Sequence, residues 1–231
     1  MGVVLVHGAY ADGSIWRDVI RELLGAGVRT TAVQNPLTSL VDDADAARRA
    51  IEAQPGKVVL VGHSWAGTVI SEIGDHDKVA GLVFVSARAP EAGEDFADIA
   101  AQFPAPPISS GVTEQDGFRR LQEDAFYRDL ANGVMQAEAQ LLYAVQAPIS
   151  RDLFSERTSR AAWKVRPTWY LISTEDRATA PSLQRFLAKR MGARTVEVAS
   201  GHLPMMTNPV EVANVILEAV TAVAVASGDC I

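Results

Sequence analysis

The sequence has one cysteine among its 231 residues, Cys230, in the penultimate position. An internal disulfide is therefore excluded, and we expect no cysteine nucleophile. Positive charge is also scarce, because 21 lysine and arginine residues face 28 aspartate and glutamate residues, which gives a formal net charge of −7. This acidic balance gives no electrostatic reason to expect nucleic acid or an anionic membrane as a partner.

We expect neither a membrane-spanning segment nor a leader segment. No apolar run approaches the roughly 18–20 residues that span a bilayer. No basic region or cleavage site precedes the first apolar stretch at 2–6, and we find no internal repeat or low-complexity linker. Apolar residues make up 48% and charged residues 21%, an ordinary globular balance. We expect a cytoplasmic protein that uses no membrane.

Alternating apolar patterns predict the fold. Strand-like runs lie near 2–6, 31–33, 57–61, 79–85, 168–173 and 194–198, and helical patterns lie at 14–24, about 40–53, 64–73, 181–191 and 208–223. Strands that alternate with helices on this scale form βαβ units, which give a parallel sheet with helices on both faces. We predict an α/β fold with about six parallel strands.

One interval, between Ala87 and Pro167, is several times longer than the dozen or so residues that a crossover needs. It contains helical patterns around 118–130 and 134–145, and a structureless loop of this length is uncommon. The predicted division is a helical cap at 88–166 and a core domain at 1–87 and 167–231. Sites in α/β sheets lie outside the carboxyl ends of the strands, so the cap should roof the site.

Residues 58 to 68 read V-V-L-V-G-H-S-W-A-G-T and place a serine between two glycines. At this point the spacing of apolar residues changes from that of a strand to that of a helix. The run before Gly62 suits a strand buried on both faces, and the spacing of apolar residues around Gly67 suits a helix. Ser64 therefore lies at a strand-to-helix turn with almost no loop, where glycines avoid the crowding that a Cβ causes. This is the form of the nucleophile elbow G-x-S-x-G, and it predicts Ser64 as the nucleophile.

A serine hydroxyl needs an adjacent base, and the chain has four histidines. His76 lies in a polar loop, and His7 ends the first strand, where it should shape the next turn. His63 is next to Ser64, but the chain direction should turn its side chain away. His202 follows the sixth strand at the same edge of the sheet as Ser64, so we expect His202 to be the base.

The base in turn needs a carboxylate that fixes its tautomer. The loop after the fifth strand offers two candidates, Glu175 and Asp176. An acid after the fourth strand is the alternative arrangement, but no acidic residue occurs there before Glu91. Either residue could serve, and of the two we prefer Asp176, with Glu175 as the alternative.

The order of these residues, serine then acid then histidine, matches α/β-hydrolases, and the chain resembles this superfamily over essentially its whole length. It is most similar to small bacterial esterase-like members and to the plant methylesterase and hydroxynitrile lyase branch. The matching segments are HGAYADGSIW at 7–16, GHSWAG at 62–67, STEDR at 173–177 and SGH at 200–202. The resemblance implies that the acid is Asp176 and that a helical cap occupies the long interval. It also implies that the chain begins at the family's third strand, which leaves six parallel strands.

Attack on an ester carbonyl makes an oxyanion, which needs preorganised N–H donors. We expect one from the backbone of Trp65, at a helix N-terminus where the dipole helps. The resemblance implies the second from Ala9, in the turn after Gly8. Tyr10 follows this turn and should border the pocket. Cap residues that could line its roof, unless they form the cap's own core, are Phe103, Phe126, Tyr127, Leu141 and Tyr143.

Together these features predict a serine hydrolase without cofactor or metal, a carboxylesterase that cleaves small, largely apolar esters through an acyl-enzyme on Ser64. Its expected partner is a small-molecule ester. A first alternative is a carbon–carbon lyase similar to the hydroxynitrile lyases. That chemistry needs a charged group near the leaving cyanide. The cap shows no clear lysine for this role, because none occurs between Lys78 and Lys164. A second alternative is a non-catalytic ligand receptor on the same fold, against which the intact triad argues.

Overall fold

The structure is a computed structural model that describes residues 1–227, so Cys230 lies outside the described residues. Its main sheet has six parallel strands in the order β2-β1-β3-β4-β8-β9. The strands are β1 (Gly2–Val6), β2 (Arg29–Ala32), β3 (Val58–His63), β4 (Val79–Val85), β8 (Thr168–Ser173) and β9 (Arg194–Val198). The predicted six-stranded parallel sheet is confirmed.

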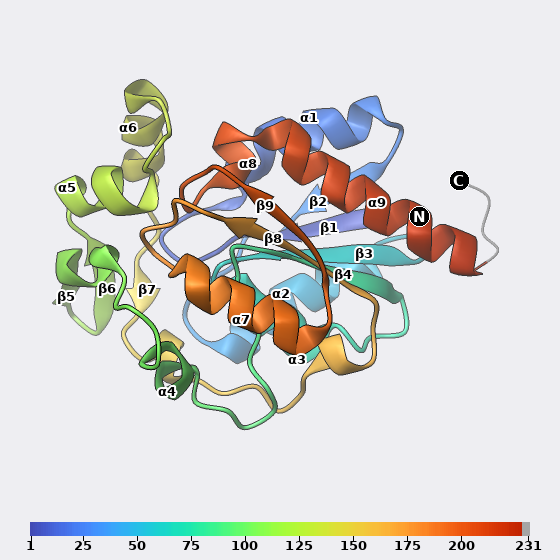
Figure 1. The fold of residues 1–231 in the computed structure, drawn as a ribbon, viewed down its shortest axis with the longest axis horizontal. Helices are drawn as coiled ribbons and strands as arrows, with labels where there is room; N and C mark the ends of the chain where they lie inside the picture. The colour runs from blue at the N-terminus through green and yellow to red at the C-terminus, as the bar shows by residue number, and fades with distance from the viewer. Residues whose placement is uncertain (228–231) are drawn as a thin grey trace.

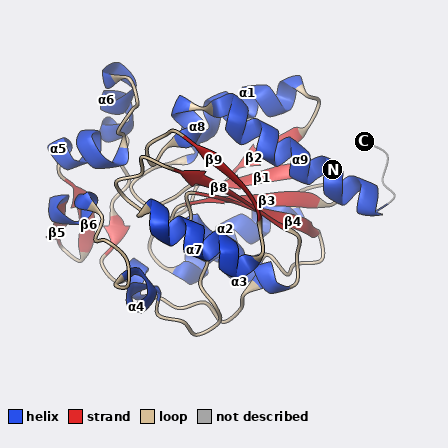
Figure 2. Cartoon of the chain, viewed as in Figure 1, coloured by secondary structure: helices blue, strands red, loops and turns tan. Residues whose placement is uncertain are grey.

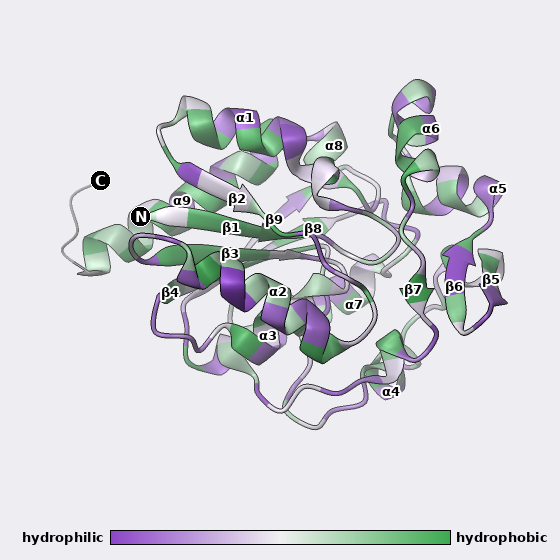
Figure 3. Ribbon diagram, turned by 180° about the vertical axis from the view of Figure 1, so that it is seen from behind, coloured by the Kyte–Doolittle hydropathy of each residue, from purple (hydrophilic) through white to green (hydrophobic). Residues whose placement is uncertain are grey.

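Helices cover both faces of this sheet (Figure 1; Figure 2). One face carries α1 (Arg17–Gly25), α8 (Pro204–Thr207) and α9 (Pro209–Ser227), and the other carries α2 (Leu40–Glu52), α3 (Ala66–Ile73) and α7 (Pro181–Met191). The central strands β1 and β3 are buried throughout and hydrophobic along their length, whereas α1 and α2 mix hydrophobic and hydrophilic residues (Figure 3). Burial on both faces explains the continuous apolar runs that mark these strands in the sequence.

The helix α9 corrects the expectation that the chain has no apolar stretch long enough to span a bilayer. Residues 209–226 are long and apolar enough, by length and composition alone, to cross a membrane. In the structure almost half of this stretch is buried, and α9 packs against α1 and β4. Val212, Ile216 and Val220 are among its buried side chains. Packing on the sheet therefore accounts for the apolar character of the helix.

Between β4 and β8 the chain forms a cap beyond the carboxyl ends of the strands (Figure 1). Its helices are α4 (Phe96–Ala100), α5 (Glu123–Ala125), the π-helical η3 (Phe126–Leu130) and α6 (Gln136–Ala144). It also contains a small antiparallel sheet of β5 (Val112–Gln115), β6 (Phe118–Leu121) and β7 (Ile149–Ser150). Short 3-10 turns are η1 (Gly13–Trp16) in the core and η2 (Pro107–Gly111), η4 (Leu153–Ser155) and η5 (Ala162–Lys164) in the insertion.

The cap is therefore not purely helical, and the helix predicted at 118–130 is wrong at its start. Residues 118–121 form β6, which pairs with β5 through the two-residue turn Asp116–Gly117. Both turn residues have positive φ, 52° and 80°, as a type I′ hairpin turn requires. The division of the chain at 88 and 166 stays a prediction, since η5 packs against α3 of the core.

The strand order reverses between β1 and β3, which places a crevice at their carboxyl ends. From β1 the chain moves outward to β2 through α1 on one face, and it then returns to β3 through α2 on the other face. Open α/β sheets bind ligands where the order reverses in this way. The turns that follow β1 and β3 therefore carry the first residues of the candidate site.

Candidate active site

Ser64 occupies the turn between β3 and α3 with a φ of 53°, in the left-handed region that residues with a Cβ seldom adopt. Its carbonyl accepts hydrogen bonds from the N–H groups of Gly67 and Arg88, each at 3.0 Å, which fixes this conformation. A Cβ on Gly67 would lie 1.9 Å from the carbonyl oxygen of Arg88, so this position requires glycine. The strained turn has the geometry of a nucleophile elbow.

His202 and Asp176 form a buried pair, with 2.8 Å between His202 Nδ1 and Asp176 Oδ2. A carboxylate oxygen accepts, so Nδ1 carries the proton and Nε2 is the basic nitrogen. Gln184 Nε2 also donates to Oδ2 at 2.7 Å. The other oxygen, Oδ1, accepts from the N–H groups of Ala178 and Thr179 at 2.7 and 2.8 Å. Four donors therefore hold the carboxylate that orients the imidazole.

Glu175, the other acid of this loop, is exposed and contributes only main-chain contacts here. Its N–H donates to Ser200 O at 3.0 Å, and its carbonyl accepts from Asn132 Nδ2 at 3.0 Å. The geometry thus brings Asp176, and not Glu175, to the imidazole of His202.

His63 links the Ser64 turn to the His202 loop. Its Nε2 donates to the carbonyl of His202 at 2.9 Å, and the two imidazole rings lie 4.7 Å apart. Burial lowers the pKa of His63 well below its ordinary value, so this ring is neutral. Within residues 1–227 the Ser64 hydroxyl makes no hydrogen bond, to His202 or to any other group. Hydrogen bonds of this kind are often long without substrate and tighten when it binds.

Two buried backbone N–H groups lie beside Ser64 without an acceptor. In the described part of the chain, neither Ala9 N–H nor Trp65 N–H donates a hydrogen bond. A Cβ on Gly8 would lie only 2.7 Å from Ser64 Cβ, so the turn that carries Ala9 contacts the turn that carries Trp65. Buried N–H groups are nearly always paired. This unpaired pair is therefore well suited to receive an oxyanion.

Side-chain hydrogen bonds hold both of these turns. His7 Nδ1 donates to the Gly8 carbonyl at 2.8 Å, and burial lowers the pKa of His7, so it stays neutral. Trp65 Nε1 donates to Asp43 Oδ2 at 2.8 Å, which ties the start of α3 to α2. Burial raises the pKa of Asp43 to about 6. The sequence predicted the role of His7 in shaping its turn, but no local pattern pointed to Asp43.

Two cavities adjoin the site under the cap, and Arg88 and Phe154 line both. The first, the apolar cavity, has a volume of about 440 Å³ and is lined by Phe96, Phe103 and Leu183 among others. The second, the polar cavity, has a volume of about 490 Å³. Its wall includes Tyr10, Arg88, Glu114, Arg119 and Phe154. Tyr10 directly follows Ala9 in the chain, and the N–H of Arg88 donates to the Ser64 carbonyl, so two residues of the polar cavity belong to segments that meet at the Ser64 turn.

Three of the predicted pocket residues lie elsewhere. The rings of Phe126, Tyr127 and Tyr143 pack against one another with centroids 5.4 to 6.2 Å apart. None of the three lines the apolar or the polar cavity. A small cap needs an apolar core of its own, and this aromatic cluster provides it. Of the other predicted roof residues, Phe103 lines the apolar cavity and Leu141 is exposed.

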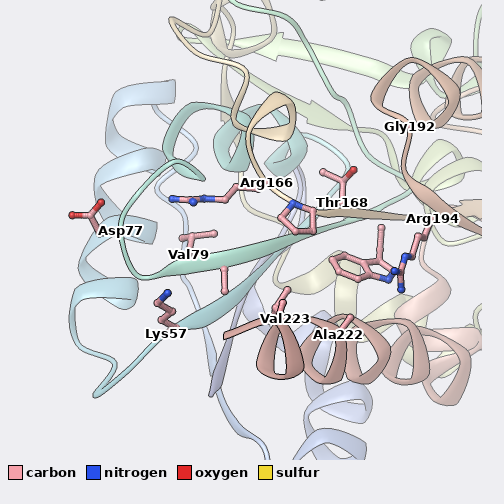
Figure 4. Close-up of a pocket in the computed structure, with 13 residues that line it drawn as sticks. Lys57, Asp77, Val79, Arg166, Thr168, Gly192, Arg194, Ala222 and Val223 are labelled. Carbon is pink, nitrogen blue, oxygen red and sulfur yellow. The ribbon is translucent and has the colours of Figure 1, made fainter. Parts of the chain in front are cut away.

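The opposite end of the sheet has a further cavity of about 450 Å³ (Figure 4). Lys57, Asp77 and Arg166 line it near the amino ends of the strands, and none of the predicted site residues does. Within residues 1–227, no group of three or more histidine, cysteine, aspartate or glutamate side chains is placed to hold a metal ion. The candidate site is therefore the edge that carries Ser64.

Sequence reasoning missed three residues that the structure brings to this edge. Gln184 on α7 donates to Asp176 and accepts from Ser173 N–H at 3.0 Å. Arg88 comes shortly after β4, and its place at the carboxyl edge of a predicted strand was the available signal. Phe154 lies in a 3-10 turn of the cap, and no local pattern connects it to the site.

Comparisons with known proteins show which proteins the whole chain is similar to. The family model described as Alpha/beta hydrolase family matches residues 3–215. The chain is 26% identical over 231 residues to the alpha/beta hydrolase nvfD of Aspergillus novofumigatus (strain IBT 16806), covering 90% of this chain and 91% of that protein. The solved structure of polyneuridine aldehyde esterase matches with a TM-score of 0.80 at 21% identity, over 94% of this chain and 98% of that chain. A methylesterase protein from Arabidopsis matches with a TM-score of 0.77 at 18% identity, over 96% and 99%.

Proposed function

The chain belongs to the α/β-hydrolase family and is related to its plant methylesterase branch, and from this premise we propose that it is a serine carboxylesterase. The proposed substrates are small, largely apolar carboxylic esters that are cleaved through an acyl-enzyme on Ser64. The observation that carries the proposal is the buried His202–Asp176 pair beside a strained serine turn and two unpaired N–H groups.

In the proposed reaction, Ser64 Oγ attacks the ester carbonyl while His202 Nε2 takes the hydroxyl proton. The carbonyl oxygen becomes negative and accepts hydrogen bonds from Ala9 N–H and Trp65 N–H. The C–O bond to the alcohol then breaks, and the proton on Nε2 goes to the leaving alcohol. Water, deprotonated by the same nitrogen, attacks the acyl-enzyme and releases the carboxylic acid.

The shape of the site supports an ester with an apolar part. Phe96, Phe103 and Leu183 on the wall of the apolar cavity match alkyl or aryl groups, whose burial contributes about 25 cal/mol per Å². The apolar part of the substrate is therefore expected to lie in this cavity, which shares Arg88 and Phe154 with the polar cavity.

Labelling with a serine-directed phosphonate, followed by hydrolysis of a panel of p-nitrophenyl esters of increasing acyl length, tests the proposal. Wild-type protein should be labelled at Ser64, and Ser64→Ala should lose the label and about 10⁶-fold in turnover. The control Ser14→Ala removes an exposed hydroxyl and should retain both. A folded Ser64→Ala protein that kept more than about a tenth of wild-type turnover would overturn the proposal.

The same panel separates the two alternatives raised by the sequence. A lyase would release cyanide from an added cyanohydrin faster than it hydrolyses any ester of the panel. A receptor would turn over neither kind of compound.

A further inference from the structure

Arg88 is a cation without a carboxylate partner at the wall of both cavities. Its backbone N–H donates to the Ser64 carbonyl at 3.0 Å, so it is fixed directly beside the nucleophile turn. Its side chain makes one long hydrogen bond, 3.5 Å from Nη1 to the Phe154 carbonyl. Within the residues that the structure describes, no aspartate or glutamate pairs with this guanidinium. Most of its donors are therefore free.

Aromatic rings surround the guanidinium of Arg88. Its Cζ lies 4.2 Å from the ring centroid of Phe154, 4.8 Å from that of Phe96 and 5.5 Å from that of Trp65. These rings attract the cation, but they also remove water, and this desolvation lowers the pKa of Arg88 to about 10. Removing water from a charge without supplying an opposite charge is unfavourable.

Another arginine of this protein in a similar setting does have an anionic partner. The guanidinium of Arg190 lies 5.6 Å from the ring of Trp163, and its Nη1 lies 2.8 Å from Glu94 Oε1. Arg119, which lines the polar cavity with Arg88, is also paired, because its Nε lies 3.2 Å from Glu114 Oε2. Among these three, Arg88 alone faces a cavity with its charge unpaired.

The hydroxyl of Tyr10 is a second unpaired group in the polar cavity. Tyr10 is 4% exposed, and in the described chain its hydroxyl has no hydrogen-bond partner. Burial raises the pKa of Tyr10 to about 12, so the group stays an O–H donor. Its ring meets the ring of Phe154 edge to face, at 6.2 Å between centroids. A cation and an O–H donor thus line one cavity; in the described chain the hydroxyl has no acceptor, and the guanidinium has only the long bond to the Phe154 carbonyl.

We propose that Arg88 and the Tyr10 hydroxyl form a carboxylate-binding subsite, and that the substrates are esters carrying a free carboxylate several bonds from the ester group. A planar carboxylate fits the guanidinium, which can donate two parallel hydrogen bonds to it. The subsite rests on the proposed function, because it specifies the substrate of the same Ser64 site. The apolar chain between ester and carboxylate would contact the aromatic rings around Arg88.

The test compares monoethyl adipate with the ethyl ester of adipamic acid, which replaces the carboxylate by a neutral amide of the same length. The wild-type kcat/KM should be about tenfold or more higher for the carboxylate, as expected for hydrogen bonds to a charged group. In Arg88→Gln this ratio should fall to near one. Arg88→Lys keeps a charge without the two parallel donors, and it should retain part of the preference.

Arg119→Gln is the matched control, because it removes a paired positive charge from the same cavity. It should leave most of the preference in place. A ratio that falls equally in Arg88→Gln and Arg119→Gln would show a general field effect and overturn the subsite. An equal ratio for both esters in wild type would overturn it as well.

Binding in the Ser64→Ala background separates this proposal from the proposed function. Calorimetric titration should show that monoethyl adipate binds and that adding Arg88→Gln weakens it by about tenfold or more, with ethyl adipamate affected far less. Binding that does not depend on Arg88, or no binding at all, would overturn the subsite. Arg88-dependent binding together with no ester turnover by wild type would support the subsite and overturn the esterase function.

Discussion

Replacing Asp176 with asparagine tests how the structure sets the tautomer of His202. In the native site Oδ1 faces two backbone N–H groups, those of Ala178 and Thr179, and Oδ2 faces His202 and Gln184. An asparagine has one oxygen and one NH2 group. The two N–H groups belong to the backbone of a turn and cannot reverse, so the amide oxygen must face them. The NH2 group therefore points at the imidazole.

An NH2 group in that position makes Nδ1 an acceptor and moves the imidazole proton to Nε2. A protonated Nε2 cannot take the proton of Ser64, so the hydrogen bond at Nδ1 is kept while the base is lost. The same substitution in Ser-His-Asp enzymes lowers kcat about 10⁴-fold, which corresponds to about 5.5 kcal/mol of barrier. We expect a loss of this order in Asp176→Asn.

In Asp176→Asn, Gln184 would also make an unfavourable contact with the new amide. Its Nε2 donates to Oδ2 at 2.7 Å, so an NH2 group there would face another NH2 group. Rotating the Gln184 amide would remove the clash, but it would also take away the oxygen that accepts from Ser173 N–H at 3.0 Å. One unpaired buried donor costs about 1–3 kcal/mol. Asp176→Asn should therefore lower the free energy of unfolding by about this amount as well.

The assay measures kcat and KM with a neutral ester, and urea denaturation measures stability, for Asp176→Asn and for the control Glu175→Gln. Glu175 has an exposed side chain, so its substitution should change kcat by less than about threefold. If folded Asp176→Asn kept kcat within about tenfold of wild type, the tautomer argument would be refuted. A larger loss in Glu175→Gln than in Asp176→Asn would move the acid role to Glu175.

Two further predictions concern the elbow and its support. Gly67→Ala places a Cβ 1.9 Å from the Arg88 carbonyl oxygen, so it should lower the unfolding free energy by at least about 1–3 kcal/mol and reduce turnover. Gly25→Ala, whose Cβ meets nothing within 4 Å, should be neutral or stabilising in the same urea titration. For Asp43 the folded pKa of about 6 lies above the ordinary 3.8, so the folded state holds a proton that the unfolded chain releases. The unfolding free energy should thus fall by up to about 3 kcal/mol as pH rises from 4 to 7. Asp43→Asn should remove this part of the slope, and a wild-type minus variant difference that is flat over that range would contradict the assignment.

The sequence was sufficient for features that depend on the order of neighbouring residues. The apolar run at 58–61 marks β3 because a strand buried on both faces has no polar alternation. Ser64 follows from the glycines around it, since the turn has no room for a Cβ at Gly67. Asp176 was preferred over Glu175 and the resemblance supported that choice, and the structure gives a local reason for it. Oδ1 accepts from N–H groups two and three residues further on, a turn typical of aspartate.

The errors in the cap have physical causes of a different kind. Residues 118–121 read as part of a helix because the aromatic and aliphatic residues there have helical spacing, yet Asp116–Gly117 is a strong hairpin signal that outweighs it. Phe126, Tyr127 and Tyr143 were expected either to line the roof of the pocket or to form the cap's own core. Which aromatic residues face a ligand and which face one another depends on how the cap folds back on itself, and a linear pattern does not contain that information.

Contacts between residues that are far apart in the chain could not be predicted from the sequence. These contacts also give the site its chemical character. Unpaired buried atoms occur away from Ser64 as well, such as Gln54 Oε1 near the amino end of the sheet. At the Ser64 edge, however, the N–H groups of Ala9 and Trp65, the hydroxyl of Tyr10 and the guanidinium of Arg88 are all donors. Donors that converge without acceptors complement negative charge. Two N–H groups match the charge that forms on the carbonyl oxygen, and the guanidinium with the hydroxyl matches a charge that the substrate brings with it. The proposed reaction and the proposed substrate class therefore rest on one property of this edge, which offers donors to an anion in a protein of net charge −7.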